Sequence, residues 1–287
     1  MDPQQIETTT RTATRDGSDY NSLRCASLTE VRGAIRTGAY RGHTAGLAPG
    51  RLQCNLVIMA RAEAEAFRGF CEANPKPCPL VAMTEPGDPI IRGLGEGIDL
   101  RTDVPAYAIH TRGQPVRHTH DIRDLWTGEM VGFAIGCSFT FERALIEAGF
   151  MLPHIERNLT VPMYRTAVET TPSGPFRGGL VVSMRPIPAE RVAEAQTVSA
   201  RYPQAHGAPV HAGDPAALGI ADLARPDWGD TILPGPGEVP VFWACGVTPQ
   251  NALENALADA DLPLVITHRP GRMLIADTDE MAATPLF

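Results

Sequence analysis

Residues 136–148 read GCSFTFERALIEA, and residues 244–256 read ACGVTPQNALENA. Aligned on their cysteines, both segments follow the pattern C-x-x-T-x-x-x-A-L-x-x-A. Each follows a short apolar run that is typical of a buried strand and continues with apolar residues at helical spacing. The two segments therefore predict one strand–turn–helix unit written twice, with Cys137 and Cys245 at equivalent turns and a capping threonine after each.

Further matches occur in the same order along both halves of the chain. Each half has a Tyr-Arg pair that opens a Gly/Pro/Thr-rich loop, a strand 16 residues after that tyrosine, a helix ending at a proline and a Gly-Asp-Pro turn. These matches pair Tyr40-Arg41 with Tyr164-Arg165, Leu56 with Leu180, and residues 87–89 with 213–215.

Asp222-Leu223-Ala224-Arg225 also loosely echoes Asp99-Leu100-Arg101, and these six ordered matches indicate an internal duplication. We predict an α/β protein with mixed sheets and flanking helices, built as two similar lobes related by a pseudo-twofold axis. The lobes are expected at residues 27–157 and 158–287, after a mobile N-terminal tail over residues 1–26. A cleft between two such lobes is a common place for a ligand.

Composition excludes several classes of protein. The formal net charge is −8 and the sequence has no basic run, which argues against nucleic acid as a partner. No run approaches 18 apolar residues and no apolar leader opens the chain, so we expect no membrane partner and a cytoplasmic location. Lys76 is the only lysine and stands between two prolines, a poor setting for a Schiff base or a P-loop.

The six cysteines form no CxxC pair, so we expect no structural zinc. Cys137 and Cys245 are the candidate catalytic cysteines, because the positive end of a helix dipole lowers the pKa of a nearby thiol. At least one is therefore expected to titrate below the usual value of about 8.5. The alternative is that both are small buried apolar residues, as we expect for the other four.

Arginine can bind a carboxylate through two parallel N–H groups. Arg36, Arg41 and Arg165 are therefore candidate substrate-binding residues. Polar side chains near these arginines are further candidates for contact with substrate. For the tyrosines among them, packing in the core is the alternative. These neighbours are Tyr40, His43 and Tyr164, together with Ser138 in the turn behind Cys137.

His206, His211 and Asp214 lie within nine residues of one another. They are candidates for acid–base catalysis, with Asp214 fixing the tautomer of an imidazole. Pro209 excludes a regular helix between the two histidines, so we predict no metal site here, although a divalent metal and a purely turn-forming role stay open as alternatives.

The sequence also resembles the bacterial putative hydro-lyase family, which shares its domain with the mitochondrial D-glutamate cyclase. The resemblance runs from about residue 27 to 277 and is carried by RGAIRTGAYRGHTAGLAPG, NPKPCPL, EPGDP, GIDLRTDVPAY, DIRDLW, GCSFTFE, VPMYRT, GPFRGGLVVSMRP, HGAPVHAGDP, GIADLARPDWGD, EVPVFWACGVTPQ and ITHRPGRML.

This resemblance implies an enzyme of amino-acid metabolism, a lyase acting on a small amino or hydroxy dicarboxylic acid with loss of water. Closure of D-glutamate to 5-oxo-D-proline is one such reaction. It requires a base such as His211 or a thiolate, and donors for the departing oxygen. Two alternatives stay open: a cofactor-independent two-cysteine racemase or epimerase, and a non-catalytic dicarboxylate-binding module. We expect no cofactor and a small carboxylate as partner, and we leave a homo-oligomer open.

Overall fold

The computed structural model describes residues 19–157, 159–259, 262–282 and 284–285. Its helices are α1 (Tyr20–Leu23), α2 (Leu28–Arg36), α3 (Arg61–Ala73), α4 (Phe139–Glu147), α5 (Pro153–Glu156), α6 (Val192–Ala200) and α7 (Val247–Asp259). The short 3-10 helices are η1 (Arg92–Leu94), η2 (Arg123–Leu125), η3 (Ala189–Arg191), η4 (Pro203–Ala205) and η5 (Pro215–Leu218). No described helix is long and apolar enough to cross a membrane.

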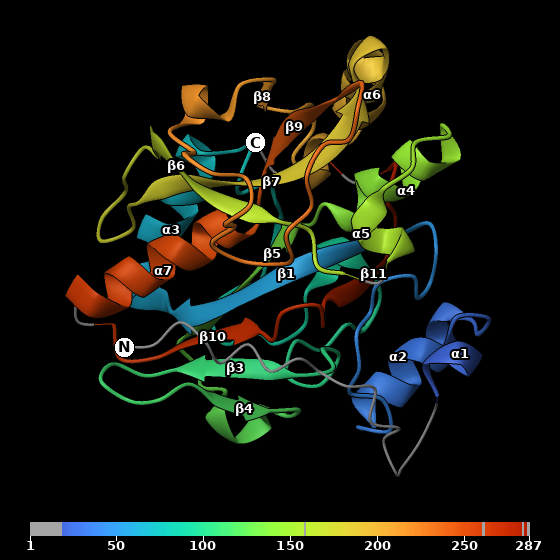
Figure 1. Ribbon diagram of the computed structural model, residues 1–287. Coiled ribbons are helices and arrows are strands. Elements are labelled where there is room, and N and C mark those ends of the chain that lie inside the picture. The colour runs from blue at the N-terminus through green and yellow to red at the C-terminus, as the bar shows by residue number, and fades with distance from the viewer. Residues whose placement is uncertain (1–18, 158, 260–261, 283, 286–287) are drawn as a thin grey trace.

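The strands form two sheets (Figure 1). The first sheet has the order β2-β5-β1-β10-β3-β4, and β11 also pairs with β1. The second has the order β6-β7-β9-β8. The strands are β1 (Arg51–Ala60), β2 (Leu80–Met83), β3 (Tyr107–His110), β4 (Arg117–Thr119), β5 (Met130–Gly136), β6 (Met163–Glu169), β7 (Gly179–Pro188), β8 (His211–Ala212), β9 (Glu238–Ala244), β10 (Val265–His268) and β11 (Leu274–Asp279).

The strand directions correct the prediction of mixed sheets. Every strand pair between these named strands is antiparallel. The predicted strand–helix–strand crossover from β1 through α3 to β2 does form. However, β5 lies between β1 and β2 and pairs antiparallel with both, so two strands that run in the same direction never become neighbours.

The end of the chain returns to the first sheet. Strands β10 and β11 pair with β1, on the side opposite to β5. The predicted second lobe, 158–287, is therefore wrong for residues 265–279, because their backbone hydrogen bonds are made with β1. The seven-stranded and four-stranded sheets also differ in size, so the pseudo-twofold duplication stays a prediction.

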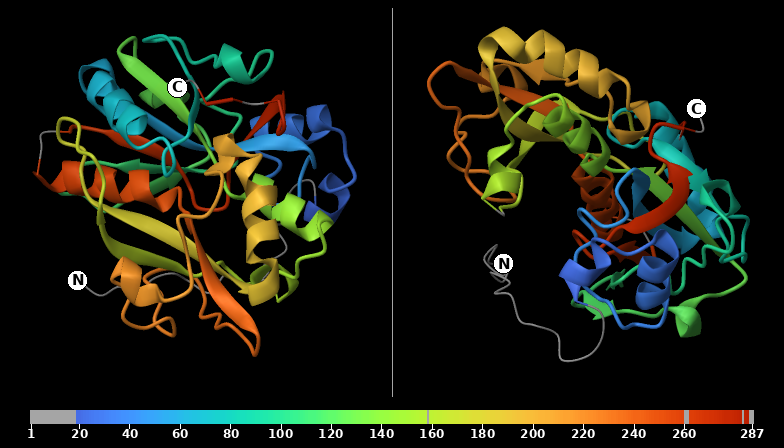
Figure 2. Two further views of the ribbon diagram at one scale, coloured as in Figure 1. Left: turned by 90° about the horizontal axis from the view of Figure 1, so that it is seen from above. Right: turned by 90° about the vertical axis from the view of Figure 1, so that its right-hand side faces the viewer.

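Each of the two helices that follow the cysteine turns leaves one sheet and packs apolar side chains in the core of the other. Helix α7 follows β9 of the second sheet, yet its Ala252, Leu253 and Ala256 pack in the core of the first, beside Phe67 and Phe133. Figure 2 shows α7 lying between the two sheets.

Helix α4 makes the opposite connection, from the first sheet to the second. It follows β5 of the first sheet, and its Phe141, Ala144 and Leu145 pack against Ile187 and Trp243 of the second. Burial of these apolar faces fixes the two sheets against each other.

In the N-terminal region the sequence correctly predicts the start and end of helix α2, whereas the prediction of a mobile tail is wrong for residues 20–23. The sequence Ser27-Leu28-Thr29-Glu30 predicts a capping box, and Ser27 and Glu30 form it. Gly38, just after the helix, has the positive φ of 73° that glycine favours there. The predicted tail includes residues 20–23, which instead form α1 with Leu23 buried. Residues 1–18 of that tail lie outside the described residues.

At Gly136 the backbone of the first sheet lies close to the backbone of η4. A Cβ at this position would lie 1.5 Å from the carbonyl oxygen of Gln204, an atom that cannot move without shifting η4. We expect Gly136→Ala to lower the free energy of unfolding by about 3 kcal/mol, as overpacking does. Urea unfolding measures the change.

Gly33→Ala is the matched control, because a Cβ there meets nothing within 4 Å and the residue lies inside α2. It is expected to stabilise the protein by about 0.5–1 kcal/mol. Equal stability of the two variants would contradict the proposed close contact.

Candidate active site

Two equivalent turns place thiols at the starts of α4 and α7. Cys137 follows β5 and its sulfur accepts a hydrogen bond from the N–H of Phe139, and Cys245 follows β9 and accepts one from the N–H of Val247. Both cysteines are buried, whereas Ser138 and Gly246 beside them are half-buried. The turns therefore lie just beneath the surface.

Thr248 has a different role from the predicted helix cap. Its hydroxyl accepts a hydrogen bond from the N–H of Val181 at 3.0 Å and lies 3.2 Å from the Val181 carbonyl oxygen. The threonine therefore ties the start of α7 to β7 and fixes the position of Cys245.

Asn55 of β1 connects the two turns. Its Nδ2 donates to the carbonyl oxygen of Gly136 at 3.0 Å, and the same atom would lie 2.6 Å from a Cβ built on Gly246. One amide side chain therefore contacts the residue before Cys137 and the residue after Cys245. Glycine at position 246 is what allows this approach.

A buried ion pair lies beside the turns. Arg185 of β7 is fully buried, and its Nε donates to Oε1 of Glu142 at 3.1 Å while Nη2 makes a second, shorter bond to the same oxygen. Nη1 donates to the hydroxyl of Ser183 at 2.9 Å. The guanidinium carbon lies 4.8 Å from the centre of the Phe141 ring and 5.3 Å from that of Trp243.

Glu142 is held ionised inside this apolar region. Burial by itself raises the pKa of a carboxyl group, but the charge of Arg185 and the bond to His154 lower the pKa of Glu142 to about 2. His154 Nε2 lies 3.0 Å from Oε1 of Glu142, and its buried Nδ1 has no partner among the described residues.

The charge on Arg185 also acts on three of the candidate catalytic groups. It lowers the pKa of the Cys137 and Cys245 thiols and of His206. His206 directly follows η4, whose Gln204 carbonyl oxygen lies against Gly136, the residue before Cys137. We call Cys137, Cys245, Glu142, Arg185 and His206 the helix-start cluster.

The predicted low pKa of these thiols is wrong. Burial raises the pKa of Cys137 to about 12 and raises that of Cys245, and this outweighs the helix N–H groups and Arg185. Both groups are therefore thiols, rather than thiolates, at neutral pH.

His206 is a neutral imidazole in the same cluster. It is buried with a positive φ of 74°, and burial lowers its pKa to about 4. Nδ1 lies 2.9 Å from the carbonyl oxygen of Lys76 and therefore carries the proton, because a carbonyl only accepts. Nε2 keeps its lone pair and has no hydrogen bond to any described residue.

His211 and Asp214 do not join this cluster. His211 stacks on Phe242, and the sheet pairing puts Phe242 on the face opposite to Trp243 and Arg185. Nε2 of His211 bonds to the backbone oxygen of Asp214, whose carboxylate accepts from the N–H of Ala216. The predicted imidazole–carboxylate contact is therefore absent from this part of the chain.

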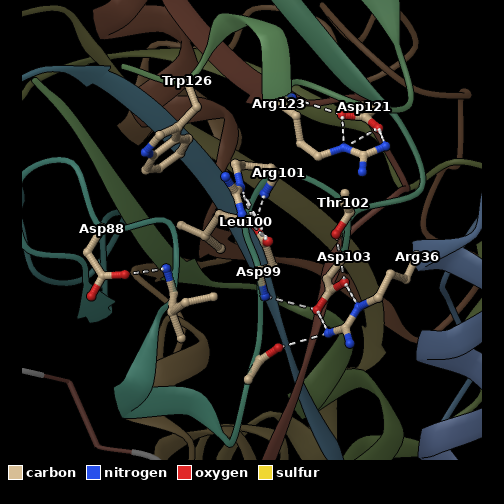
Figure 3. Close-up of polar contacts among 12 residues, drawn as sticks. Arg36, Asp88, Asp99, Leu100, Arg101, Thr102, Asp103, Asp121, Arg123 and Trp126 are labelled. Carbon is tan, nitrogen blue, oxygen red and sulfur yellow. Dashed lines mark hydrogen bonds and ion pairs between the residues drawn. The ribbon is translucent and has the colours of Figure 1, made fainter. Parts of the chain in front are cut away.

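Arg36 binds an internal carboxylate instead of an open site (Figure 3). Its Nε lies 2.7 Å from Oδ1 of Asp103 and its Nη2 2.5 Å from Oδ2, and Asp103 is buried. The adjacent cavity has a volume of about 300 Å³ and is lined by Arg36, Ile90, Gly97, Asp99, Arg101, Thr102 and Arg123.

The other arginines of this cavity are also neutralised. Arg101 and Arg123 each bind an aspartate two residues away, Asp99 and Asp121 (Figure 3). A substrate carboxylate would have to compete with these internal ion pairs.

Two tyrosines are core residues, as the alternative interpretation stated. Tyr40 is buried beside α2 with its hydroxyl on the carbonyl oxygen of His43, and burial raises its pKa. Tyr164 is buried in the second sheet with its hydroxyl on the Leu223 carbonyl oxygen, and burial raises its pKa to about 12.

Arg41 and Arg165 do not share partners. Arg165 lies in β6, so the predicted loop at Tyr164-Arg165 is wrong. It binds Asn251 and Asp227 and stacks over Trp228. Arg41 lies with His43 in the loop after α2, where it contacts His120. Nothing in these contacts supports the second copy of a Tyr-Arg loop.

Sequence reasoning missed Asn55, Glu142, Arg185 and His154. One signal was available, because Arg185 is a lone charge inside the apolar run of β7, and such residues are buried only with a partner. Its partner on α4 could not be read from local spacing.

Within the described residues, no group of three or more His, Cys, Asp or Glu side chains is placed to hold a metal ion.

Comparison with known proteins decides the family. Residues 131–277 match the family described as D-glutamate cyclase. Proteins named "Putative hydro-lyase" from Jannaschia sp. and Rubrobacter xylanophilus are each 57% identical to this chain, over 91% and 86% of it and over 97% and 94% of their own length. The chain belongs to the D-glutamate cyclase family.

The matched region of the family contains every member of the helix-start cluster, from Cys137 to Cys245. Another relative of the same name, from Dinoroseobacter shibae, is 57% identical over 93% of this chain and 88% of its own length. Among solved structures, a nitrogen repressor-like protein from Methanococcus jannaschii covers 86% of the chain and 96% of its own, with a TM-score of 0.34 and 11% identity.

The burial of two histidines makes the stability of the folded protein depend on pH. Burial lowers the pKa of both His206 and His268 to about 4, whereas an unfolded histidine titrates near 6.5. Between these values the unfolded chain binds more protons, so stability is complete above about pH 6.5 and decreases as the pH falls toward 4.

Urea unfolding at pH 7 and pH 5 is expected to show this loss, and His206→Gln is expected to reduce it. His118→Gln is the control, because His118 is exposed. The same pH dependence in all three proteins would exclude His206 as its source.

Proposed function

We propose that this protein is a carbon–oxygen lyase that closes D-glutamate to 5-oxo-D-proline with release of water. Membership of the D-glutamate cyclase family supports this reaction class. The observation that carries the proposal is the helix-start cluster, which joins two protonated thiols, a neutral imidazole and a buried ion pair.

The reaction moves two protons and needs no outside reagent. The α-ammonium loses one proton and its nitrogen attacks the γ-carboxyl carbon, which forms a tetrahedral intermediate. The second proton then leaves the nitrogen, and one carboxyl oxygen departs as water with both protons. A site for this reaction therefore needs a base near the nitrogen and donors near the oxygen.

His206 is our candidate for the base. Its Nδ1–H is held by the Lys76 carbonyl, so its basic nitrogen is Nε2. Its pKa of about 4 keeps the ring neutral at physiological pH, so no proton has to leave the ring before it can accept one. This gives His206 the role of base, for which the chemistry of ring closure had indicated His211 or a thiolate.

The two thiols are our candidates for the donors. Because burial raises their pKa, each keeps its S–H at neutral pH and is able to donate toward a departing oxygen. Ser138, half-buried between Cys137 and α4, is a further candidate for contact with substrate. Glu142 and Arg185 position α4 and β7 around them rather than binding substrate, since their charges already satisfy each other.

The raised thiol pKa gives no support to a two-base racemase, which needs one thiolate at neutral pH. Retention of the Cα hydrogen in deuterated water separates the two reactions, because ring closure leaves that hydrogen in place. The absence of a cofactor requirement and a cytoplasmic location stay predictions, and turnover after dialysis against a chelator measures the first.

We expect the purified protein to convert D-glutamate to 5-oxo-D-proline, detected by chromatography. Cys137→Ala and Cys245→Ala are expected to lower kcat/KM by at least about 100-fold, the usual contribution of a positioned acid or base. Cys→Ser at each position is expected to keep part of the activity, because a hydroxyl still donates.

Cys71→Ala is the matched control, since Cys71 is also buried but lies in the core of the first sheet. It is expected to lower stability and leave activity per folded molecule unchanged. Full activity in both alanine variants at the helix starts would refute a catalytic role for the thiols.

A further inference from the structure

Two loops meet at the start of β1 and the end of β10, and they carry three arginines and a histidine. The loops are residues 37–50 and 269–273, and the side chains are Arg41, His43, Arg269 and Arg272, which we call the loop cation cluster. Thr44 N–H donates to the carbonyl oxygen of Gly271 at 2.9 Å, and Thr44 Oγ1 accepts from the N–H of Met273 at 3.0 Å.

Gly271 lets His43 pack directly on the second loop. Its φ is 75°, and a Cβ there would lie 2.2 Å from Nδ1 of His43. Arg272 completes the junction, because its Nε donates to the carbonyl oxygen of Arg41 at 3.0 Å and its Nη1 to that of Pro270 at 3.1 Å. Backbone carbonyl oxygens thus hold the Arg272 guanidinium at the junction of the two loops.

No carboxylate of the described residues forms an ion pair with any member of this cluster. Arg36, Arg101 and Arg123 show the opposite arrangement, each bound to an aspartate (Figure 3). Guanidinium groups without an internal carboxylate partner are able to bind an anion from outside the chain.

The cations also repel one another. Burial and the charges of Arg272 and Arg269 lower the pKa of His43, and burial and the charge of Arg269 lower that of Arg272. A bound anion would relieve both effects, because an opposite charge favours the protonated forms.

Donors remain available for such an anion. In the described structure, the guanidinium of Arg269 makes no side-chain hydrogen bond, and Nη1 of Arg41 and Nη2 of Arg272 are also unused. Guanidinium groups match a carboxylate with two parallel N–H bonds.

Strand β1 connects this cluster to the helix-start cluster. Gln53 Nε2 donates to the carbonyl oxygen of Thr44 at 2.9 Å, and Asn55, two residues along the same strand face, donates to Gly136. Side chains two residues apart lie on the same face of a strand, so β1 aligns the backbone of the first loop with the turn at Cys137.

We propose that the loop cation cluster binds the carboxylate of the substrate that does not react, which in D-glutamate is the α-carboxylate. This inference rests on the proposed function for the identity of the reacting end, but the binding it assigns is measured without turnover. It also gives Arg41 and His43 a shared role with residues that the sequence did not single out.

Calorimetric titration with glutarate and with D-glutamate tests the cluster. Arg269→Gln is the main variant, because its guanidinium supports no described contact, and it is expected to weaken both affinities by about 10-fold to 100-fold. Arg272→Gln is expected to weaken them as well, with a thermal melt to separate this effect from loosening of the loop.

Arg225→Gln removes the same charge from an exposed position in the second half of the chain and is expected to change neither affinity. Unchanged affinities in Arg269→Gln, or no binding of either dicarboxylate by the unmodified protein, would overturn the inference. Binding of glutarate that depends on Arg269, together with no turnover of D-glutamate, would support the cluster and refute the proposed reaction.

Discussion

The ion pair between Glu142 and Arg185 is the interaction on which the arrangement of the two halves depends. Glu142 belongs to the helix that leaves the first sheet, and Arg185 to a central strand of the second. Removing either partner would leave a buried charge without compensation, which typically costs about 3–5 kcal/mol. The pair therefore selects one docking of α4 on the second sheet, and with it one position for Cys137.

Helices α4 and α7 each connect one sheet to the core of the other, which explains why the candidate active site belongs to neither half alone. Each helix begins at a cysteine turn and then packs on the sheet to which it is not directly connected. The two turns consequently lie close together between the sheets, with Asn55 in contact with both. The close approach at Gly136 and Gly246 is possible because neither residue has a side chain.

Arginine serves two purposes in this nearly lysine-free chain. Some arginines, such as Arg36 and Arg185, bind internal carboxylates and hold segments together. Others, such as Arg272 of the loop cation cluster, bind backbone oxygens and have no carboxylate partner within the described structure. Only the second kind has binding capacity left for a carboxylate from outside, which is why residue type alone did not identify the binding arginines.

The sequence by itself determined the features that depend on neighbouring residues. The capping box of α2, the helix after β1 and the cysteines at the starts of two helices are all confirmed, because caps and periodic burial are local properties. Only the tertiary structure decided the antiparallel pairing, the return of β10 and β11 to the first sheet, the partner of Arg36 and the protonation of the thiols. Each of these depends on which distant segment covers a group, and burial by distant segments raised the pKa of Cys137 more than its own helix lowered it.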